Sequence, residues 1–358
     1  LNLNLANQTG AFSDKNAGIN KVVNVTGATV TDGTGLASNY AFSNASGVTA
    51  TITPKALTVT GVTAASRDYD GTQQAALSGG VLSGLVGMET LNLNLANQTG
   101  AFSDKNAGIN KVVNVTGATV TDGTGLASNY AFSNASGVRA DIGKASISSV
   151  TNVGVNNKTY DGLSTATLNG AATFNGKVNG DSLTLAGSGA FSDKNAGTGK
   201  TVTVSGITLG GADAGNYNLV SNASSGMADI GKATISGVTN VGVNNKIYDG
   251  VTTATLNGAA NFNGKVNGDS LTLAGNGAFS DQNVATGKVV TVSGITLSGL
   301  DAGNYVLASN ASSGTADITP KALTVTGHVA GNKVYDGNAV AQLLGGSLVG
   351  LVGDETLA

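Results

Sequence analysis

Cysteine and tryptophan are absent from this chain of 358 residues, and proline, histidine and glutamate are scarce. There are two prolines, one histidine (His328) and glutamate only at Glu89 and Glu355. Without cysteine the chain can form neither disulfides nor thiolate metal sites, so its stability must come from packing and backbone pairing. Charged residues are 11% of the total, and the net charge is −3 without basic runs. This composition argues against nucleic acid as a partner.

Long apolar runs are also missing, so we expect no membrane insertion. Apolar residues nevertheless make up 40% of the chain, which is enough to build cores, and glycine occurs 54 times. Asparagine, serine and threonine supply most of the polarity. The chain is therefore too apolar and too weakly charged for the usual composition of disordered proteins.

The chain is internally repetitive, because residues 1–48 recur letter for letter as 91–138. Two tyrosine motifs give the period, which is 87 to 91 residues. The tyrosines of the Tyr-Asp-Gly motif are Tyr69, Tyr160, Tyr248 and Tyr335, and those of the Asn-Tyr motif are Tyr40, Tyr130, Tyr217 and Tyr305. This period is longer than one solenoid coil and suits one small domain per repeat.

Recurrent lysines set the boundaries of the repeats. Residues 55–143, 144–231 and 232–320 are three full repeats, 1–54 is the C-terminal part of a repeat, and 321–358 is the N-terminal part of another. Neither partial repeat alone can cover its apolar face. We therefore expect residue 358 of one copy to lie beside residue 1 of the next in a filament. The join would be covalent, within a longer polypeptide, or a non-covalent complementation of strands.

Each repeat has the pattern of short β-strands. KTVTVSG at 200–206 and KVVTVSG at 288–294 alternate apolar residues with Thr and Ser, as half-buried strands do. Asn-Gly and Asp-Gly pairs, which favour hairpin turns, interrupt the strands every few residues. The sequence predicts an all-β fold, a tandem array of small antiparallel β-sandwich domains of immunoglobulin-like type. Units resembling a β-grasp are the alternative.

The string Asp-Ala-Gly-Asn-Tyr before Tyr217 and Tyr305 resembles the tyrosine corner of immunoglobulin-like sandwiches. We expect both rings to be buried, with each hydroxyl bonded to upstream backbone. One such hydrogen bond would be worth about 0.5–1.5 kcal/mol. The copies ending at Tyr40 and Tyr130 lack the Asp, so that aspartate cannot be essential to the fold.

No constellation of residues indicates catalysis, a cofactor or a metal. Tyr-Asp-Gly is interpreted as the end of a strand with an Asp-Gly turn rather than as a ligand site. The recurrent aspartates are spread singly, and no calcium-binding loop occurs. An isopeptide bond between Lys144 and Asn216, or Lys232 and Asn304, would need a buried acid that the sequence does not place. The eight tyrosines are therefore predicted to be structural residues, and we expect no enzyme.

The motifs K-x-Y-D-G, G-D-S-L, F-S-D-K-N-A-G and D-A-G-N-Y follow one another in this order, in a pattern that extends over the whole chain as three full units and two partial ones. Together they resemble the YDG-type repeat of large bacterial haemagglutinin-like exoproteins. The resemblance implies a secreted or cell-surface protein similar to the filamentous haemagglutinin-type adhesins, which are often exported by two-partner secretion. It supplies no catalytic residues. The first copies depart from the pattern, with G-M-E-T-L where later ones have G-D-S-L.

Two hypotheses of function follow. In the first, the repeats form a stalk or filament of an adhesin or extracellular matrix fibre, as in a biofilm, with neighbouring repeats or copies of the chain as partners. In the second, each repeat is a weak carbohydrate- or protein-binding module, facing a host or matrix surface and acting through avidity. An exposed aromatic platform would favour the second, but few aromatic residues remain outside the recurrent motifs.

Overall fold

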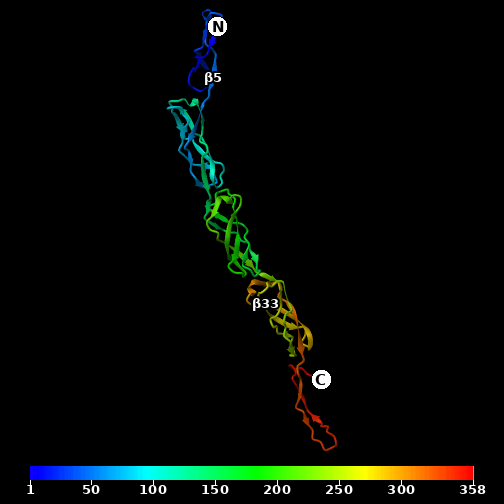
Figure 1. Cartoon of the computed structure of the whole chain (residues 1–358). Helices are drawn as coiled ribbons and strands as arrows, with labels where there is room; N and C mark the ends of the chain where they lie inside the picture. Colours follow the sequence, from blue (N-terminus) through cyan, green and yellow to red (C-terminus); the bar gives the residue numbers. More distant parts are fainter. Residues whose placement is uncertain (358) are drawn as a thin grey trace. The chain divides into compact units, whose positions relative to one another are not determined.

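The structure, a computed structural model, describes residues 1–357 and consists of short strands joined by tight turns (Figure 1). The predicted all-β class and the tandem arrangement of units are confirmed. The α-helix that a β-grasp fold packs on its sheet is not found in residues 1–357. Residue 358, where the expected tail-to-head join would lie, is outside the described residues, so that join stays a prediction.

The repeat 55–143 contains twelve strands and a 3-10 turn. They are β6 (Lys55–Thr60), β7 (Thr63–Ala64), β8 (Arg67–Asp68), β9 (Gln74–Ala75), β10 (Leu77–Ser78), β11 (Val81–Ser83), β12 (Leu91–Asn94), β13 (Thr99–Phe102), β14 (Gly108–Thr116), β15 (Thr119–Asp122), η2 (Ala127–Asn129), β16 (Tyr130–Ser133) and β17 (Arg139–Gly143). A five-stranded sheet has the order β8-β17-β14-β13-β9, and a three-stranded sheet has the order β11-β6-β16.

Two full repeats follow with fewer, longer strands. The repeat 144–231 has β18 (Ala145–Ile147), β19 (Ser149–Thr151), β20 (Lys158–Thr159), β21 (Thr165–Ala166), β22 (Thr173–Asn175), β23 (Thr184–Phe191), β24 (Gly197–Gly210), η3 (Ala214–Asn216), β25 (Tyr217–Leu219) and β26 (Ser224–Gly231). The repeat 232–320 has β27 (Ala233–Ile235), β28 (Gly237–Thr239), β29 (Lys246–Ile247), β30 (Thr253–Ala254), β31 (Asn261–Asn263), β32 (Thr272–Phe279), β33 (Ala285–Ser298), η4 (Ala302–Asn304), β34 (Tyr305–Leu307) and β35 (Ser312–Thr319). Their five-stranded sheets, β20-β26-β24-β23-β21 and β29-β35-β33-β32-β30, have equivalent orders.

Strand pairing refines the predicted antiparallel sandwich. Most pairs are antiparallel, but two in each repeat are parallel. In the repeat 55–143 these are β6 with β16 and β8 with β17. In each pair a segment that opens the repeat lies beside a segment that closes it and runs in the same direction.

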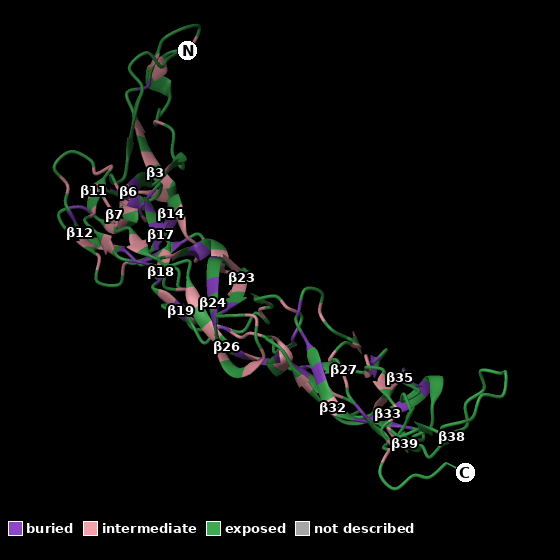
Figure 2. Cartoon of the chain, turned by 90° about the horizontal axis from the view of Figure 1, so that it is seen from below, coloured by how far each residue is buried: buried purple, intermediate pink, exposed green. Residues whose placement is uncertain are grey.

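The cores form from the period-two pattern read in the sequence. Along β24, Val202 and Val204 are fully buried while their neighbours face outward, and along β33, Val290 and Val292 are buried in the same way. Figure 2 shows these buried stretches in purple, whereas the chain near both termini is mostly green with some pink. Alternation of this kind is what one buried sheet face requires.

The flanking segments are strand-rich but mostly exposed. Residues 1–54 contain β1 (Asn2–Asn4), β2 (Thr9–Phe12), β3 (Gly18–Thr26), β4 (Thr29–Thr31), η1 (Ala37–Asn39) and β5 (Thr49–Ile52). Residues 321–357 contain β36 (Thr324–Thr326), β37 (Val329–Ala330), β38 (Leu343–Leu344) and β39 (Ser347–Val349). Ala28 is the one buried residue of 1–54, and none of 321–357 is buried.

By its internal contacts the chain divides into two compact units. The first comprises Leu1–Ser149, Phe174–Thr184 and Leu209–Val220, and the second comprises Val150–Thr173, Leu185–Thr208 and the chain from Ser221 onward. The division passes through the repeat 144–231. The residues that form each junction between consecutive repeats therefore belong to one unit.

Candidate functional site

Three of the four tyrosines of Tyr-Asp-Gly, namely Tyr69, Tyr160 and Tyr248, lie at the junctions between repeats. Tyr69 and Tyr160 are buried, with 4% and 3% of their surface exposed. The Tyr69 hydroxyl donates to Asp181 at 3.1 Å and the Tyr160 hydroxyl to Asp269 at 2.9 Å, in each case a carboxylate of the next repeat. Tyr248 likewise donates to Glu355. The Asp-Gly turn predicted for this motif is present, but its tyrosine also contacts the following repeat.

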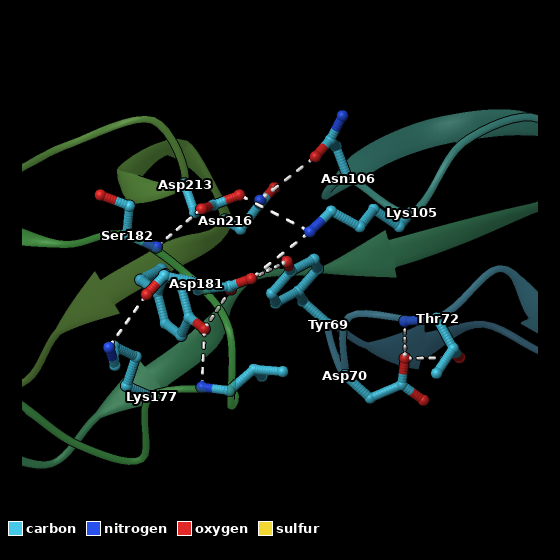
Figure 3. Close-up of polar contacts among 12 residues, drawn as sticks. Tyr69, Asp70, Thr72, Lys105, Asn106, Lys177, Asp181, Ser182, Asp213 and Asn216 are labelled. Atoms are coloured by element: carbon cyan, nitrogen blue, oxygen red, sulfur yellow. Dashed lines mark hydrogen bonds and ion pairs between the residues drawn. The ribbon is translucent and has the colours of Figure 1, made fainter.

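Asp181 is the acceptor at the first of these junctions (Figure 3). Its carboxylate accepts hydrogen bonds from the hydroxyls of Tyr69 and Tyr217, the latter at 2.6 Å, and Lys105 Nζ lies 3.4 Å away. Burial alone raises the pKa of this carboxyl, but the two tyrosine hydroxyls and the lysine outweigh burial, and the pKa lies below its ordinary value. The acceptor is therefore a buried, ionised aspartate.

The tyrosines of the Asn-Tyr motif complete the acceptor. Tyr217 and Tyr305 are buried, as predicted. Their hydroxyls accept from the backbone N–H of Val178 and Val266, at 2.8 and 2.9 Å, and donate to the acceptor carboxylates. The backbone partner is 39 residues upstream, so the arrangement differs from a tyrosine corner, whose partner is a few residues away. Burial, followed by the Asp181 hydrogen bond, raises the pKa of Tyr217 to about 12.

One short turn supplies the carboxylate in every copy. The acidic residue stands three positions after a valine, and its N–H bonds the valine carbonyl at 3.0 to 3.2 Å. The pairs are Val86–Glu89, Val178–Asp181, Val266–Asp269 and Val352–Glu355. At Glu89 the carboxylate accepts the Tyr130 hydroxyl at 2.7 Å. The G-M-E-T-L departure therefore keeps the carboxylate at the same position in the turn.

Sequence reasoning did not assign a role to these four acids. The signal was present, because the two glutamates of the chain stand at equivalent positions and each acid follows a valine at the same spacing. We name this group the acceptor turn. It comprises Val86–Glu89, Val178–Asp181, Val266–Asp269 and Val352–Glu355.

A second loop, F-S-D-K-N-A-G at residues 12–18, 102–108 and 191–197, also contacts the next repeat. The N–H of Ala107 donates to Asn216 Oδ1 at 2.9 Å, and Asn216 Nδ2 donates to Asn106 Oδ1 at 3.2 Å. Lys105 Nζ also lies 3.7 Å from Asp213. The Asn216 amide, considered above for an isopeptide bond with Lys144, is thus hydrogen-bonded to the preceding repeat.

Equivalent contacts recur at two further junctions. Ala196 donates to Asn304 at 2.9 Å, and Lys194 lies 3.4 Å from Asp269. Ala17 donates to Asn129 at 2.8 Å. The recurrence with equivalent residues shows that the junction is encoded in the repeat.

The tyrosine rings also contact each other across the junctions. Tyr69 and Tyr217 pack edge to face with centroids 5.5 Å apart, and Tyr160 and Tyr305 repeat this geometry at 5.5 Å. Such pairs contribute about 0.5–1.5 kcal/mol beyond area burial. Tyr40 and Tyr335 lie outside these clusters, with 63% and 94% of their surface exposed.

The aspartate and the glycine of Tyr-Asp-Gly have distinct roles. Asp70 Oδ1 accepts from the N–H of Thr72 at 2.8 Å and thereby caps its own turn. Gly71 has a φ of +80°, and a Cβ on it would lie 2.9 Å from a methyl of Val178 in the acceptor turn. Gly162 and Gly250 meet Val266 and Val352 at the same 2.9 Å. The motif therefore combines a tyrosine hydroxyl that donates to the next repeat, a turn capped by its aspartate, and a glycine that lets the backbone lie close to the valine of the acceptor turn.

Replacing Gly162 with alanine should loosen the second junction by about 1–3 kcal/mol, since both the left-handed backbone and the approach to Val266 oppose a side chain. The measurement is hydrogen exchange of the Ala196 amide, which should accelerate. Gly170→Ala is the matched control, because Gly170 has a φ of +83° but open space around its Cβ position. Equal acceleration in both variants would contradict a role for the Val266 contact.

Nothing in residues 1–357 forms a group of three or more His, Asp or Glu side chains suited to a metal ion. In the same residues no helix is long and apolar enough to cross a membrane.

Fold and junctions define a class: an all-β tandem-repeat protein whose consecutive repeats are joined by a recurrent buried contact. A family model described as the YDG domain matches residues 53–137, 144–225 and 232–313. These matches cover more than half of the chain, which belongs to the YDG domain family. The comparison with curated proteins found no match.

Proposed function

We propose that the chain is a structural spacer, the repeat region of a stalk or filament of an exported bacterial adhesin or extracellular matrix fibre. The observation that carries the proposal is the recurrence of the junction. On one side each full repeat has the tyrosine of Tyr-Asp-Gly and the loop that begins Phe-Ser-Asp, whose next residue is lysine or glutamine. On the other side it has an acceptor turn and an Asn-Tyr pair. A unit with complementary ends adds to itself head to tail without limit.

The short connections between repeats support the same proposal. One residue, Lys144, separates β17 from β18, and one residue, Lys232, separates β26 from β27. A binding module acting through avidity profits from flexible linkers that let each unit find its own ligand. A one-residue connection with a buried contact beside it suits a spacer better.

Amide ¹⁵N relaxation of the full chain tests the proposal. Residues 55–143 and 144–231 should report one common rotational correlation time, because the junction contacts restrain them against independent tumbling. Separate correlation times, each of a single repeat, would contradict the spacer. Saturable binding of the chain to a defined glycan or matrix protein through individual repeats would favour the alternative of a multivalent binding module.

A further inference from the structure

The first and last segments of each repeat run parallel and side by side. In the repeat 144–231, Ala145–Ile147 pairs in parallel with Tyr217–Leu219, and Lys158–Thr159 pairs in parallel with Ile230–Gly231. The repeat 232–320 has the same two pairings, Ala233–Ile235 with Tyr305–Leu307 and Lys246–Ile247 with Ile318–Thr319. The repeat 55–143 pairs β6 with β16 and β8 with β17.

Further hydrogen bonds tie the opening segment to the closing segment. Ala308 N–H donates to Ile235 O at 3.0 Å, and Ser312 Oγ donates to Val238 O at 2.6 Å. Tyr248 N–H donates to Thr319 O at 2.9 Å. Equivalent bonds join Val220 to Ile147, Ser224 to Val150 and Tyr160 to Gly231. The pairing is thus distributed along the segments rather than confined to one end.

Parallel terminal strands respond to tension in a particular way. In a tandem array a pulling force enters a repeat at the N-terminal end of its opening segment and leaves at the C-terminal end of its closing segment. When those segments are parallel neighbours, the two forces are opposed along the strand axis and load all the hydrogen bonds between them together. Antiparallel terminal strands would instead be pulled apart from one end, one bond at a time.

We propose that every YDG repeat of this chain is a mechanical clamp, in which the parallel opening and closing segments are loaded in shear and resist unfolding under tension. The proposal rests on the proposed spacer function and adds that each repeat resists unfolding when the spacer is under tension. The one-residue connections at Lys144 and Lys232 transmit load from the closing strand of one repeat into the opening strand of the next.

Force spectroscopy on the full chain, held by handles at its two ends, tests the clamp, because forced unfolding reports the unfolding barrier rather than equilibrium stability. Wild type should give three rupture events of similar high force. Each event should release on the order of 300 Å of chain, the extended length of one repeat.

A matched pair of variants in the repeat 232–320 separates the clamp from general destabilisation. Ala308→Pro removes the N–H that bonds Ile235, whereas Ser280→Pro removes an N–H that bonds Val289 at 3.1 Å in the β32–β33 hairpin. Both side chains are exposed, and each change deletes one backbone bond. Ala308→Pro should lower one of the three rupture forces to half or less, and Ser280→Pro should leave all three unchanged.

A milder variant, Ser312→Ala, removes the bond to Val238 and keeps the test decisive if Ala308→Pro prevents folding of its repeat. It should lower one rupture force measurably. Equal effects of the clamp and hairpin variants, or three low-force events in wild type, would overturn the clamp. The spacer function would survive that result, since it fails only if the repeats tumble independently in the relaxation experiment.

Discussion

Replacing Asp181 with alanine should open the junction between the repeats 55–143 and 144–231. The buried carboxylate accepts two tyrosine hydroxyls and lies beside Lys105, so its loss leaves two buried donors without this acceptor. Hydrogen bonds to charged groups are worth about 1.5–3 kcal/mol each, and buried groups left unpaired cost a similar amount. We expect the junction to lose about 2–4 kcal/mol.

Hydrogen exchange of single amides measures this loss. The Ala107 amide donates across the affected junction, and its protection should fall about 100-fold, since each 1.4 kcal/mol is tenfold. The Ala196 amide donates across the next junction and should be unchanged. Asp193→Asn is a matched control, because Asp193 is an exposed acid paired with Lys200. Unchanged protection of Ala107 in the Asp181→Ala chain would show that the carboxylate does not hold the junction.

Acid should weaken the same junction in the wild-type chain. Because the pKa of Asp181 is lowered in the folded state, its contribution is fully present above the ordinary carboxyl pKa of about 3.9. The contribution is lost as the pH falls below that value through the folded-state pKa. Protection of Ala107 should therefore fall with acid in wild type more steeply than in Asp181→Ala.

Replacing Tyr305 with phenylalanine should destabilise its repeat by about 2–3 kcal/mol, more than the 0.5–1.5 expected for one ordinary hydrogen bond. The hydroxyl donates to the ionised Asp269 at 2.5 Å and accepts from Val266 N–H at 2.9 Å. The substitution therefore removes a charge-assisted bond and leaves a backbone donor without its partner. The rest of the ring is retained, so packing should change little.

Exchange of the Val266 amide in the Tyr305→Phe chain is the direct measurement, and it should accelerate about 30- to 100-fold. Tyr335→Phe provides the control, because that ring is exposed and belongs to no cluster. If Tyr305→Phe and Tyr335→Phe give the same small change in the exchange rate of the Val266 amide, the hydroxyl of Tyr305 does not stabilise the repeat.

Much of the fold could be predicted because it depends on local patterns. The alternation of apolar and polar residues along 200–206 and 288–294 correctly predicted the buried valines of β24 and β33. The Asp-Gly pairs of Tyr-Asp-Gly form turns in which the glycine has a positive φ. The burial of Tyr217 and Tyr305 was also predicted, from the resemblance of Asp-Ala-Gly-Asn-Tyr to a tyrosine corner. Alternation does not indicate whether a neighbouring strand runs parallel or antiparallel. The parallel pairing of the opening and closing segments was therefore not predicted.

The junction itself could not be derived from the motifs one at a time. Tyr69 and Asp181 are 112 residues apart, and nothing near Tyr69 distinguishes a tyrosine that ends a strand from one that binds the next repeat. A comparison of all four copies would have shown the constant spacing from valine to acid. It would not have shown which tyrosine the acid accepts.

Sequence alone determined the class of structure, the number of repeats and the equivalence of their motifs, because periodicity and turn chemistry are local properties. Tertiary structure decided the environment of each motif. Residues 1–48 and 91–138 are identical, yet Tyr40 is 63% exposed and Tyr130 only 6%. The physical reason is that Tyr130 packs against Leu57 and Leu91 and donates its hydroxyl to Glu89, whereas among residues 1–357 no segment covers Tyr40 in this way. Burial and hydrogen bonding thus depend on which segments meet in space.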